Sequence, residues 1–433
     1  MGESVLTGAA TFARGANGGG ALACEGVPLA RIADAVGTPA FVYSVNFLRE
    51  RFATLSSALA GIPHRVHYSV KANDNLAVLA TLRELGAGVD IVSAGELHRA
   101  LRAGFTGRDI VFSGVGKTAE EIRLALEADV HFFNVESDGE LELIAAVASA
   151  EGREARVALR VNPEVDVETL HHYTRTGSRG DKFGVPYAEV PALAARAVEL
   201  PRVRLVGLDM HVGSQLTSLA PFERGVERML DLLERVRAAG APDLGWLDLG
   251  GGLGVPYAPG DAELDLEAFA ALARSAAERS GLDLVIEPGR FLVANAGVLL
   301  TRVLYRKRSG GTDFVITDAG MTELMRPSHY QAYHRVEAVA PRDGGGRVDV
   351  VGPVCESGDF LAHGREIGEV EPGDLVAVHS AGAYGYVMSS NYNARRRPPE
   401  VLVDGERFAV VTRRETFDDL TRLETTEPRW EDR

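Results

Sequence analysis

The sequence predicts an α/β protein: a (β/α)8 TIM barrel followed by an all-β domain. From about residue 40 to 295, short β-rich runs alternate with amphipathic helical patterns, giving eight units in roughly the length that such a barrel requires. Past residue 295 the helical patterns stop, and short strands alternate with glycine-rich turn signals. We therefore expect an N-terminal segment (1–39) that joins the β domain, a barrel (40–296), and a β-sandwich or Greek-key barrel (297–433).

The alternation of β-rich and helical runs predicts the individual strands and helices along the chain. A doubly wound sheet is the competing α/β interpretation, but the polar candidates close nearly every strand instead of gathering at one switch point. The tail after Asp418 is charged, and we expect a helix with a frayed end there. The expected barrel strands are 65–70, 89–93, 110–113, 131–135, 155–162, 205–212, 246–250 and 284–287, with helices such as 119–127, 188–200, 222–239 and 266–280. In the β domain we expect strands at 297–305, 313–317, 348–354, 375–380 and 408–413, with a strand or two from before residue 40.

Composition argues against several classes of function. The formal net charge of −15 disfavours nucleic acid or an anionic membrane as the main partner. The chain has neither an apolar run long enough to span a membrane nor the pattern of a secretory signal. Only Cys24 and Cys355 occur, without the paired spacing of structural zinc sites. We therefore expect a cytoplasmic protein without disulfides or a metal site.

Lys71 follows the apolar run VHYSV at residues 66–70, and an apolar strand end can desolvate an ammonium group. Desolvation lowers the pKa of lysine, and neutral lysine forms Schiff bases. Alone, a solvated lysine at a strand end is the simpler interpretation. Glycine-rich loops at residues 250–254 and 289–290 change the balance, because they follow the seventh and eighth expected strands. Barrels commonly bind phosphate there, and glycine lets backbone N–H groups approach its oxygens.

Two further strand ends carry side chains suited to an aromatic cofactor. Glu287 precedes the second glycine loop, and a carboxylate facing the ring nitrogen of pyridoxal phosphate makes that ring a strong electron sink. A surface ion pair is the alternative for Glu287. His211 ends the sixth expected strand, where an imidazole could stack on a flat ring. A satisfied core histidine is the usual alternative for His211.

These residues lie within a series of ordered strings. Over residues 39–424 the chain resembles the fold-type III, alanine-racemase-like pyridoxal-phosphate decarboxylases, and the string RPxxY points to the diaminopimelate branch of that family. The matching strings are HYSVKAN (67–73), GVDIVSAGE (88–96), HVGSQ (211–215), DLGGGLG (248–254), EPGR (287–290), GMTELMRPSHY (320–330), CESG (355–358) and GAYGY (382–386).

The resemblance implies a cofactor, pyridoxal 5'-phosphate, and a role for each matching residue. Lys71 would hold the cofactor covalently, His211 would pack on its ring, and Glu287 would pair with its ring nitrogen. The glycine loops and the Tyr384 hydroxyl would bind the phosphate. The cofactor-binding residues implied are Lys71, His211, Gly251, Gly252, Glu287, Gly289, Arg290 and Tyr384.

The resemblance also implies a reaction, the decarboxylation of meso-2,6-diaminopimelate to L-lysine in the last step of lysine biosynthesis. The distal end of this substrate carries a carboxylate, which suits arginine donors, and an ammonium group, which suits Glu356. An ornithine or arginine decarboxylase would leave two arginines there unpaired. The substrate-binding residues implied are Arg290, Arg326, Tyr330, Glu356, Tyr384 and Ser214.

Family members build each active site across a head-to-tail homodimer, so Cys355 and Glu356 would come from the partner subunit. Lys71, Cys355 and His211 are the implied catalytic residues, with Cys355 or a group that it positions returning a proton to Cα. Residues 171–184 resemble the mobile segment of the family, and we expect a lid there.

Three alternatives remain at this point. A decarboxylase of the same fold could act on a carrier-tethered or D-configured amino acid. A non-catalytic barrel could store pyridoxal phosphate, although Cys355 and Tyr384 argue against this. A racemase is disfavoured because Glu287 stands where related racemases have arginine.

Overall fold

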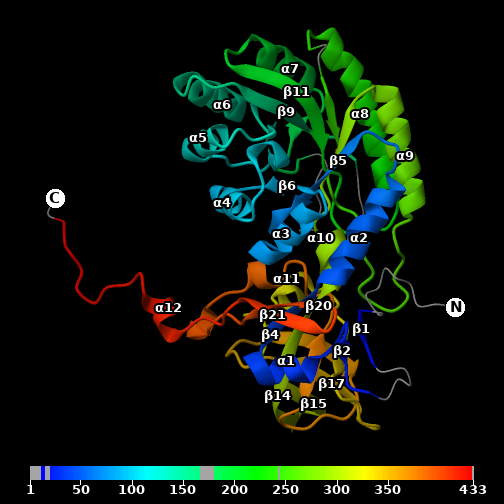
Figure 1. Cartoon of the computed structure of the whole chain (residues 1–433), viewed down its shortest axis with the longest axis vertical. Helices are drawn as coiled ribbons and strands as arrows, with labels where there is room; N and C mark the ends of the chain where they lie inside the picture. Colours follow the sequence, from blue (N-terminus) through cyan, green and yellow to red (C-terminus); the bar gives the residue numbers. More distant parts are fainter. Residues whose placement is uncertain (1–10, 15–19, 166–179, 242–243, 432–433) are drawn as a thin grey trace. The chain divides into compact units, whose positions relative to one another are not determined.

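The computed structural model describes residues 11–14, 20–165, 180–241 and 244–431. The chain divides into two compact units (Figure 1). Val45–Ala296 and Gly382–Val387 belong to the first, which we call the barrel unit. Phe12–Ser44, Gly297–Ala381 and the chain from Met388 onward belong to the second, the sheet unit.

Eight parallel strands close on themselves in the barrel unit, because the last strand pairs with the first (Val285 with Arg65). This confirms the predicted TIM barrel, with all eight predicted strands in place. In barrel order they are β5 (His64–Ser69), β6 (Gly88–Ile91), β7 (Ile110–Phe112), β8 (Phe132–Val135), β9 (Ala155–Asn162), β11 (Val203–Met210), β12 (Trp246–Asp248) and β13 (Asp283–Ile286). The two-residue strand β10 (Val185–Pro186) pairs with β9 at the side.

Helices surround the strands of the barrel unit (Figure 1). Several begin where the sequence supplies a cap: Thr118 and Glu121 form a reciprocal capping box at the start of α5, and Asp265 accepts the Ala268 N–H at the start of α9. The helices are α2 (Val45–Ala58), α3 (Leu76–Glu84), α4 (Ala94–Arg102), α5 (Ala119–Glu127), α6 (Asp138–Ala150), α7 (Val190–Glu199), α8 (Ala220–Ala238), α9 (Leu266–Ser280) and α10 (Arg290–Val293), with 3-10 turns η2 (Val70–Ala72), η3 (Gly107–Asp109) and η5 (Ala294–Ala296).

The sheet unit contains a large sheet in the order β18-β17-β15-β14-β4-β20-β21, with β19 pairing β14 and β16. Its strand β4 (Ala40–Ser44) lies between β14 and β20, so an N-terminal strand does join this sheet, although residues 40–44 were expected at the start of the barrel. The other strands are β14 (Gly297–Ser309), β15 (Thr312–Thr317), β16 (Val336–Ala338), β17 (Arg347–Val351), β18 (Phe360–Glu366), β19 (Leu375–Val378), β20 (Glu400–Asp404) and β21 (Arg407–Thr412).

Smaller elements complete the second unit. A three-stranded sheet of β1 (Phe12–Ala13), β2 (Ala23–Cys24) and β3 (Val27–Pro28) precedes α1 (Leu29–Val36). Short helices α11 (Arg326–Tyr330) and α12 (Phe417–Thr421) and the 3-10 turn η7 (Tyr392–Ala394) follow later in the chain, whereas the 3-10 turn η6 (Tyr386–Met388) begins in the barrel unit and ends at the first residue of the returning sheet unit. The charged tail therefore does begin with a helix, as predicted. In the described part of the chain, no helix combines the length and apolar character needed to cross a membrane.

The barrel interior changes character along its strands. An apolar layer contains Val111, Phe132, Ala158, Val206 and Val285. Beyond it, toward the carboxyl ends, a polar side chain lies near the end of each strand or directly after it, and most of these side chains are almost fully buried. We call these eight residues the polar ring: Ser69, Asp90, Ser113, Asn134, Arg160, Asp209, Asp248 and Glu287.

Candidate active site

Lys71 lies in the 3-10 turn that directly follows β5, at the carboxyl end of the barrel. The turn is held in place because the Tyr384 N–H donates to the Ala72 carbonyl at 2.8 Å and the Asn73 amide donates to the Gly382 carbonyl at 3.0 Å. Residues 382–387 are therefore part of the barrel unit although they come late in the sequence.

The Lys71 ammonium pairs with the buried Asp90 carboxylate at 2.8 Å. Burial lowers the pKa of Lys71, but attraction to Asp90 and then Glu287 outweighs this effect, so the pKa lies above its usual value. The expectation that burial would lower the pKa of Lys71 is therefore wrong for the protein alone. The side chain is still 40% exposed, so the amine can be reached by a cofactor.

Hydrogen bonds connect successive members of the polar ring. The Ser69 hydroxyl contacts Asp90 at 3.1 Å and the Glu287 carbonyl at 3.0 Å. The Asn134 amide donates to the Ser113 hydroxyl at 3.1 Å and reaches a Glu287 carboxyl oxygen at 3.4 Å. Glu287 is thus fixed by neighbours from other strands and is not in a surface ion pair.

Three carboxyl groups of the ring lie together: one oxygen each of Asp209, Asp248 and Glu287 lies within 4.8 Å of the others. Burial raises the pKa of all three, and mutual repulsion adds to it for Asp209 and Glu287; for Asp248 the pKa reaches about 7. This spacing also suits a cation, but Arg160 already lies 3.8 Å from Asp209. Buried acids this close relieve their repulsion by keeping protons, so the cluster is protonated in part at neutral pH.

The glycine loop after β12 is shaped by positive φ angles, +68° at Gly250 and +92° at Gly252. A Cβ on Gly252 would lie 2.2 Å from the Gly213 carbonyl oxygen, and one on Gly251 would lie 2.2 Å from the Glu287 carbonyl oxygen. Only glycine fits such contacts. Asp248 fixes the start of the loop by accepting the Gly250 N–H at 2.8 Å.

His211 comes directly after β11 and touches the same loop. The Gly251 N–H donates to His211 Nδ1 at 3.2 Å, so this nitrogen carries no proton and the proton of the neutral ring is on Nε2. Burial lowers the pKa of His211 to about 3, helped by the positive charges of Arg160 and Lys71. The imidazole is therefore neutral at physiological pH, which suits a ring that packs against another flat ring.

Arg290 begins α10 after the eighth strand and is buried. Its guanidinium donates to the Tyr257 hydroxyl at 2.7 Å and to the Ser214 hydroxyl at 3.4 Å, and it lies 4.8 Å from the centre of the Tyr384 ring. The barrel unit thus brings together every predicted site residue that it contains: Lys71, His211, Ser214, Gly251, Gly252, Glu287, Gly289, Arg290 and Tyr384.

These groups fit pyridoxal phosphate. An accessible amine, a neutral imidazole, a buried carboxyl with a raised pKa, and a glycine loop with no space for Cβ atoms all lie at the carboxyl ends of the strands. In barrels this end carries the active site.

The remaining predicted residues lie in the sheet unit. Arg326 and Tyr330 are the first and last residues of α11; Arg326 is buried and Tyr330 half-buried. Cys355 and Glu356 are exposed on the loop between β17 and β18. The Asp359 carboxylate accepts the N–H groups of Met321 and Val354, both at 2.6 Å, so it holds this loop against the segment that precedes α11.

Sequence reasoning missed four ring members that carry charge: Asp90, Arg160, Asp209 and Asp248. Each is a charged residue near the end of an otherwise apolar strand, and this isolated charge is the sequence feature that could have identified it as a site residue. Asp90 and Asp248 even lie within strings that match the family.

The expected lid falls mostly on residues 166–179, which lie outside the described residues. Beyond them, the Gly184 N–H donates to Glu136 at 2.9 Å, and the Arg160 guanidinium lies 5.1 Å from the centre of the Phe183 ring.

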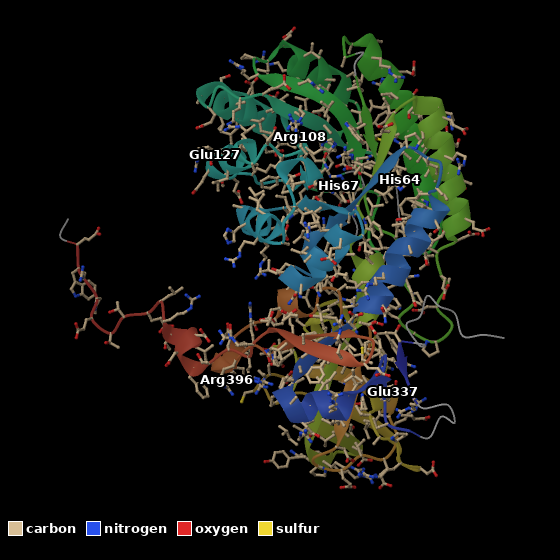
Figure 2. The ribbon with its side chains drawn as sticks, viewed as in Figure 1. His64, His67, Arg108, Glu127, Glu337 and Arg396 are labelled. Atoms are coloured by element: carbon tan, nitrogen blue, oxygen red, sulfur yellow. The ribbon has the colours of Figure 1, made fainter. Side chains whose placement is uncertain are left out.

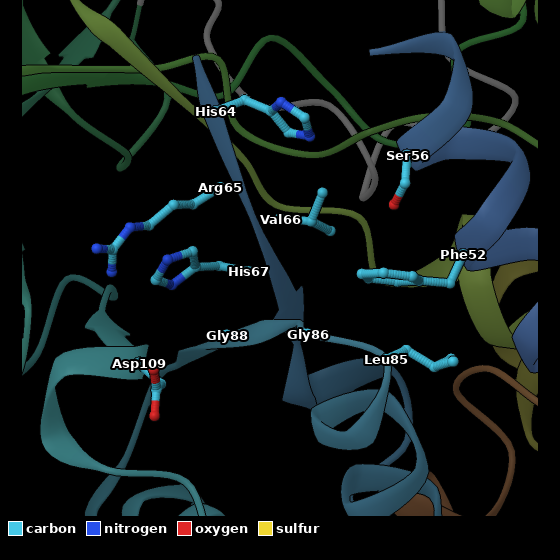
Figure 3. A pocket seen from close by; sticks show the side chains of 10 residues that line it. All are labelled: Phe52, Ser56, His64, Arg65, Val66, His67, Leu85, Gly86, Gly88 and Asp109. Atoms are coloured by element: carbon cyan, nitrogen blue, oxygen red, sulfur yellow. The ribbon is translucent and has the colours of Figure 1, made fainter. Parts of the chain in front are cut away.

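A separate hollow of about 390 Å³ lies at the opposite end of β5, around His64, Arg65 and His67 (Figures 2 and 3). Figure 3 shows Arg65 and His67 on one side of the strand and Val66 and Phe52 on the other. This hollow is at the amino ends of the strands, away from the site described above.

Comparisons with known proteins agree with this geometry. The family model for the pyridoxal binding domain of pyridoxal-dependent decarboxylases matches residues 45–294. The diaminopimelate decarboxylase of Pseudomonas aeruginosa is 52% identical over 400 residues, which cover 92% of this chain and 95% of the relative. That of Aquifex aeolicus is 44% identical over 400 residues, 92% of this chain and 94% of the relative.

Solved structures give the same result. Diaminopimelate decarboxylase from Helicobacter pylori complexed with L-lysine is 38% identical with a TM-score of 0.88, covering 91% of this chain and 98% of that one. The enzyme from M. jannaschii in co-complex with L-lysine is 34% identical with a TM-score of 0.91, covering 97% and 99%.

Proposed function

This chain belongs to the diaminopimelate decarboxylase family of pyridoxal-dependent decarboxylases, and on that basis we propose that it converts meso-2,6-diaminopimelate to L-lysine and carbon dioxide. The observation that carries the proposal is the convergence of Lys71, His211, Glu287 and the glycine loop at the carboxyl ends of the barrel strands. It is a carboxy-lyase of lysine biosynthesis with pyridoxal phosphate as cofactor.

When bound, the cofactor supplies an electron sink for the pair of electrons that the departing carboxylate leaves on Cα. Lys71 would hold the cofactor covalently through its side-chain amine. Glu287, whose pKa is raised by burial, would share a proton with the ring nitrogen, and His211 would support the ring as a neutral imidazole. The backbone N–H groups of Gly251 and Gly252 would bind the phosphate, with Gly289, Arg290 and the Tyr384 hydroxyl.

Substrate choice depends on the distal end of the diamino-diacid. Arg290, Arg326 and Tyr330 donate to its carboxylate, Glu356 accepts from its ammonium group, and Ser214 and Tyr384 support Arg290. After carbon dioxide leaves, one proton is added to Cα from Cys355 or a group that it positions. The product is L-lysine, which keeps the distal carboxylate.

We also propose that the protein is a homodimer in which each active site receives Cys355 and Glu356 of the partner subunit. The exposure of both residues fits this role. A cytoplasmic location is proposed because a reducing compartment preserves the free Cys24 and Cys355 thiols.

The test is the reaction itself. Purified protein should carry the yellow absorbance of a covalently held cofactor and release equimolar lysine and carbon dioxide from meso-diaminopimelate. Lys71→Ala should lose both properties, whereas Lys307→Ala, which changes an exposed lysine on β14, should keep both. Turnover of a different amino acid, with none of meso-diaminopimelate, would refute the substrate and leave the cofactor assignment standing.

A further inference from the structure

Arg326, the proposed ligand of the distal carboxylate, is held by a buried histidine. Its guanidinium Nη1 lies 2.9 Å from Nε2 of His334, and both side chains are buried, with 7% and 1% of their surfaces exposed. The Nδ1 atom of His334 lies 2.8 Å from the carbonyl oxygen of His379. One imidazole therefore connects the first residue of α11 to the residue that directly follows β19.

These two contacts fix the protonation of the ring. A carbonyl oxygen only accepts hydrogen bonds, so Nδ1 of His334 carries a proton. A guanidinium only donates, so Nε2 of His334 presents its lone pair to Arg326. Both contacts are satisfied only by the neutral imidazole with its proton on Nδ1. In that form His334 is an acceptor aimed at Arg326.

The ring is itself positioned by the sheet. β16 and β19 are antiparallel, with Val336 opposite Val378, and the His379 N–H donates to the Arg335 carbonyl at 2.8 Å. The His379 imidazole pairs in turn with Glu337 of β16 at 2.7 Å. The carbonyl that orients His334 thus belongs to the residue directly after β19, which is held by its own N–H and side chain to residues 335 and 337.

We propose that His334 is a positioning residue that fixes the Arg326 guanidinium for the distal carboxylate of the substrate. The inference rests on the proposed function, in which Arg326 binds that carboxylate. A guanidinium recognises a carboxylate through a planar fork of N–H groups, so the direction of the fork matters as much as its charge. His334 therefore determines affinity for the diamino-diacid and has little effect on the chemical step.

Two substitutions separate the two contacts of the ring. In His334→Gln the longer amide can place its oxygen near the former Nε2 position and accept from Arg326. In His334→Asn the shorter amide can place its N–H near the former Nδ1 position and keep only the contact to His379. We expect KM for meso-diaminopimelate to rise about ten-fold in His334→Asn and to recover largely in His334→Gln. Turnover number and bound cofactor should stay near wild type in both.

A ligand control shows whether the effect passes through the carboxylate. L-Lysine keeps the distal carboxylate. Cadaverine is the same five-carbon diamine without that carboxylate. Inhibition by L-lysine should weaken in His334→Asn in parallel with KM, and inhibition by cadaverine should not change. In an Arg326→Gln background, His334→Asn should add no further rise in KM.

Several results would overturn the proposal. Equal KM values in the two variants, a proportional loss of turnover number, or equal weakening of cadaverine would each assign His334 a general structural role. Loss of the folded protein in both variants would do the same. If Arg326→Gln alone left KM unchanged, the carboxylate assignment within the proposed function would fail, independently of the contact with His334.

Discussion

At Lys71 two opposing effects act on one ammonium group. Burial favours the neutral amine, while the Asp90 carboxylate at 2.8 Å favours the charged one, and the second effect is stronger. The lysine must lose its proton before it can bind an aldehyde. Asp90 therefore keeps Lys71 in its protonated, ammonium form in the cofactor-free protein.

The Asp90→Asn variant tests this arrangement. Removal of the carboxylate should lower the pKa of Lys71, so cofactor-free protein should capture pyridoxal phosphate at lower pH, with a rate near neutrality that rises about ten-fold for each unit by which the pKa falls. The measurement is the rate of covalent capture as a function of pH. A pH profile that is unchanged from wild type would show that Asp90 does not control the amine.

Individual site residues differ in how well the sequence alone predicts them. Lys71, His211 and Glu287 were found because each ends a strand and lies within a recognisable string. Arg160 and Asp209 were missed, although they lie 3.8 Å apart, because their contact depends on the register between β9 and β11. Such a register is a property of the closed barrel and is not visible in either strand alone.

At the scale of elements, the polar ring makes the stability of the cofactor-free protein depend on pH. In the folded state the pKa of Asp248 is raised from 3.8 to about 7, and Asp209 and Glu287 shift in the same direction. Between these pH values the folded state binds more protons than the unfolded chain. The contribution of Asp248 to the free energy of unfolding therefore falls as pH rises through this window and levels off above about pH 7.

Asp248→Asn should reduce that fall, because the amide has no proton to lose. One group contributes at most about 1.4 kcal/mol per pH unit, so the variant should show a visibly smaller decrease in Tm between about pH 5 and 7. Asp283→Asn, which changes an exposed carboxylate on β13, is the control and should follow wild type. Parallel Tm curves for Asp248→Asn and wild type would contradict the proton-sharing cluster.

The glycine loop after β12 should bind the cofactor phosphate only if Gly252 has no side chain. Gly252 and Gly260 have nearly the same φ, +92° and +88°, but a Cβ would meet the Gly213 carbonyl at 2.2 Å in the first and nothing within 4 Å in the second. Backbone strain should cost each alanine variant about 1–2 kcal/mol of stability. Only Gly252→Ala should also lose cofactor affinity, by about ten-fold or more, in a titration of cofactor-free protein. Equal affinities in the two variants would argue against a phosphate cradle at Gly252.

Strand prediction succeeded where the pattern was local. The eight barrel strands and five strands of the sheet unit were predicted, but β16, β18 and β20 were not. β16 has only three residues, and β18 is interrupted by Gly364. β4 was expected inside the barrel region, yet it pairs with β14, far along the chain, through Tyr43 and Gly297. Such a pairing between distant segments leaves no periodic signal in the sequence.

At the scale of the whole molecule, the predicted domain boundaries at residues 39 and 296 stay a prediction, and so does the dimer. The two sets of predicted site residues lie in different units, and the resemblance assigns Cys355 and Glu356 to the partner subunit. A shared site has a consequence that a self-contained site lacks: two inactive variants can restore each other.

Mixing Lys71→Ala with Cys355→Ala tests this directly. A hybrid dimer would contain one site with both changes and one site with neither, so random reassociation should restore up to about a quarter of wild-type activity. Lys71→Ala mixed with Glu287→Gln is the matched control. Lys71 and Glu287 belong to the same barrel, so no hybrid site would be intact and no activity should return. Recovery in neither mixture, with hybrid dimers shown to form, would mean that each subunit supplies its own Cys355.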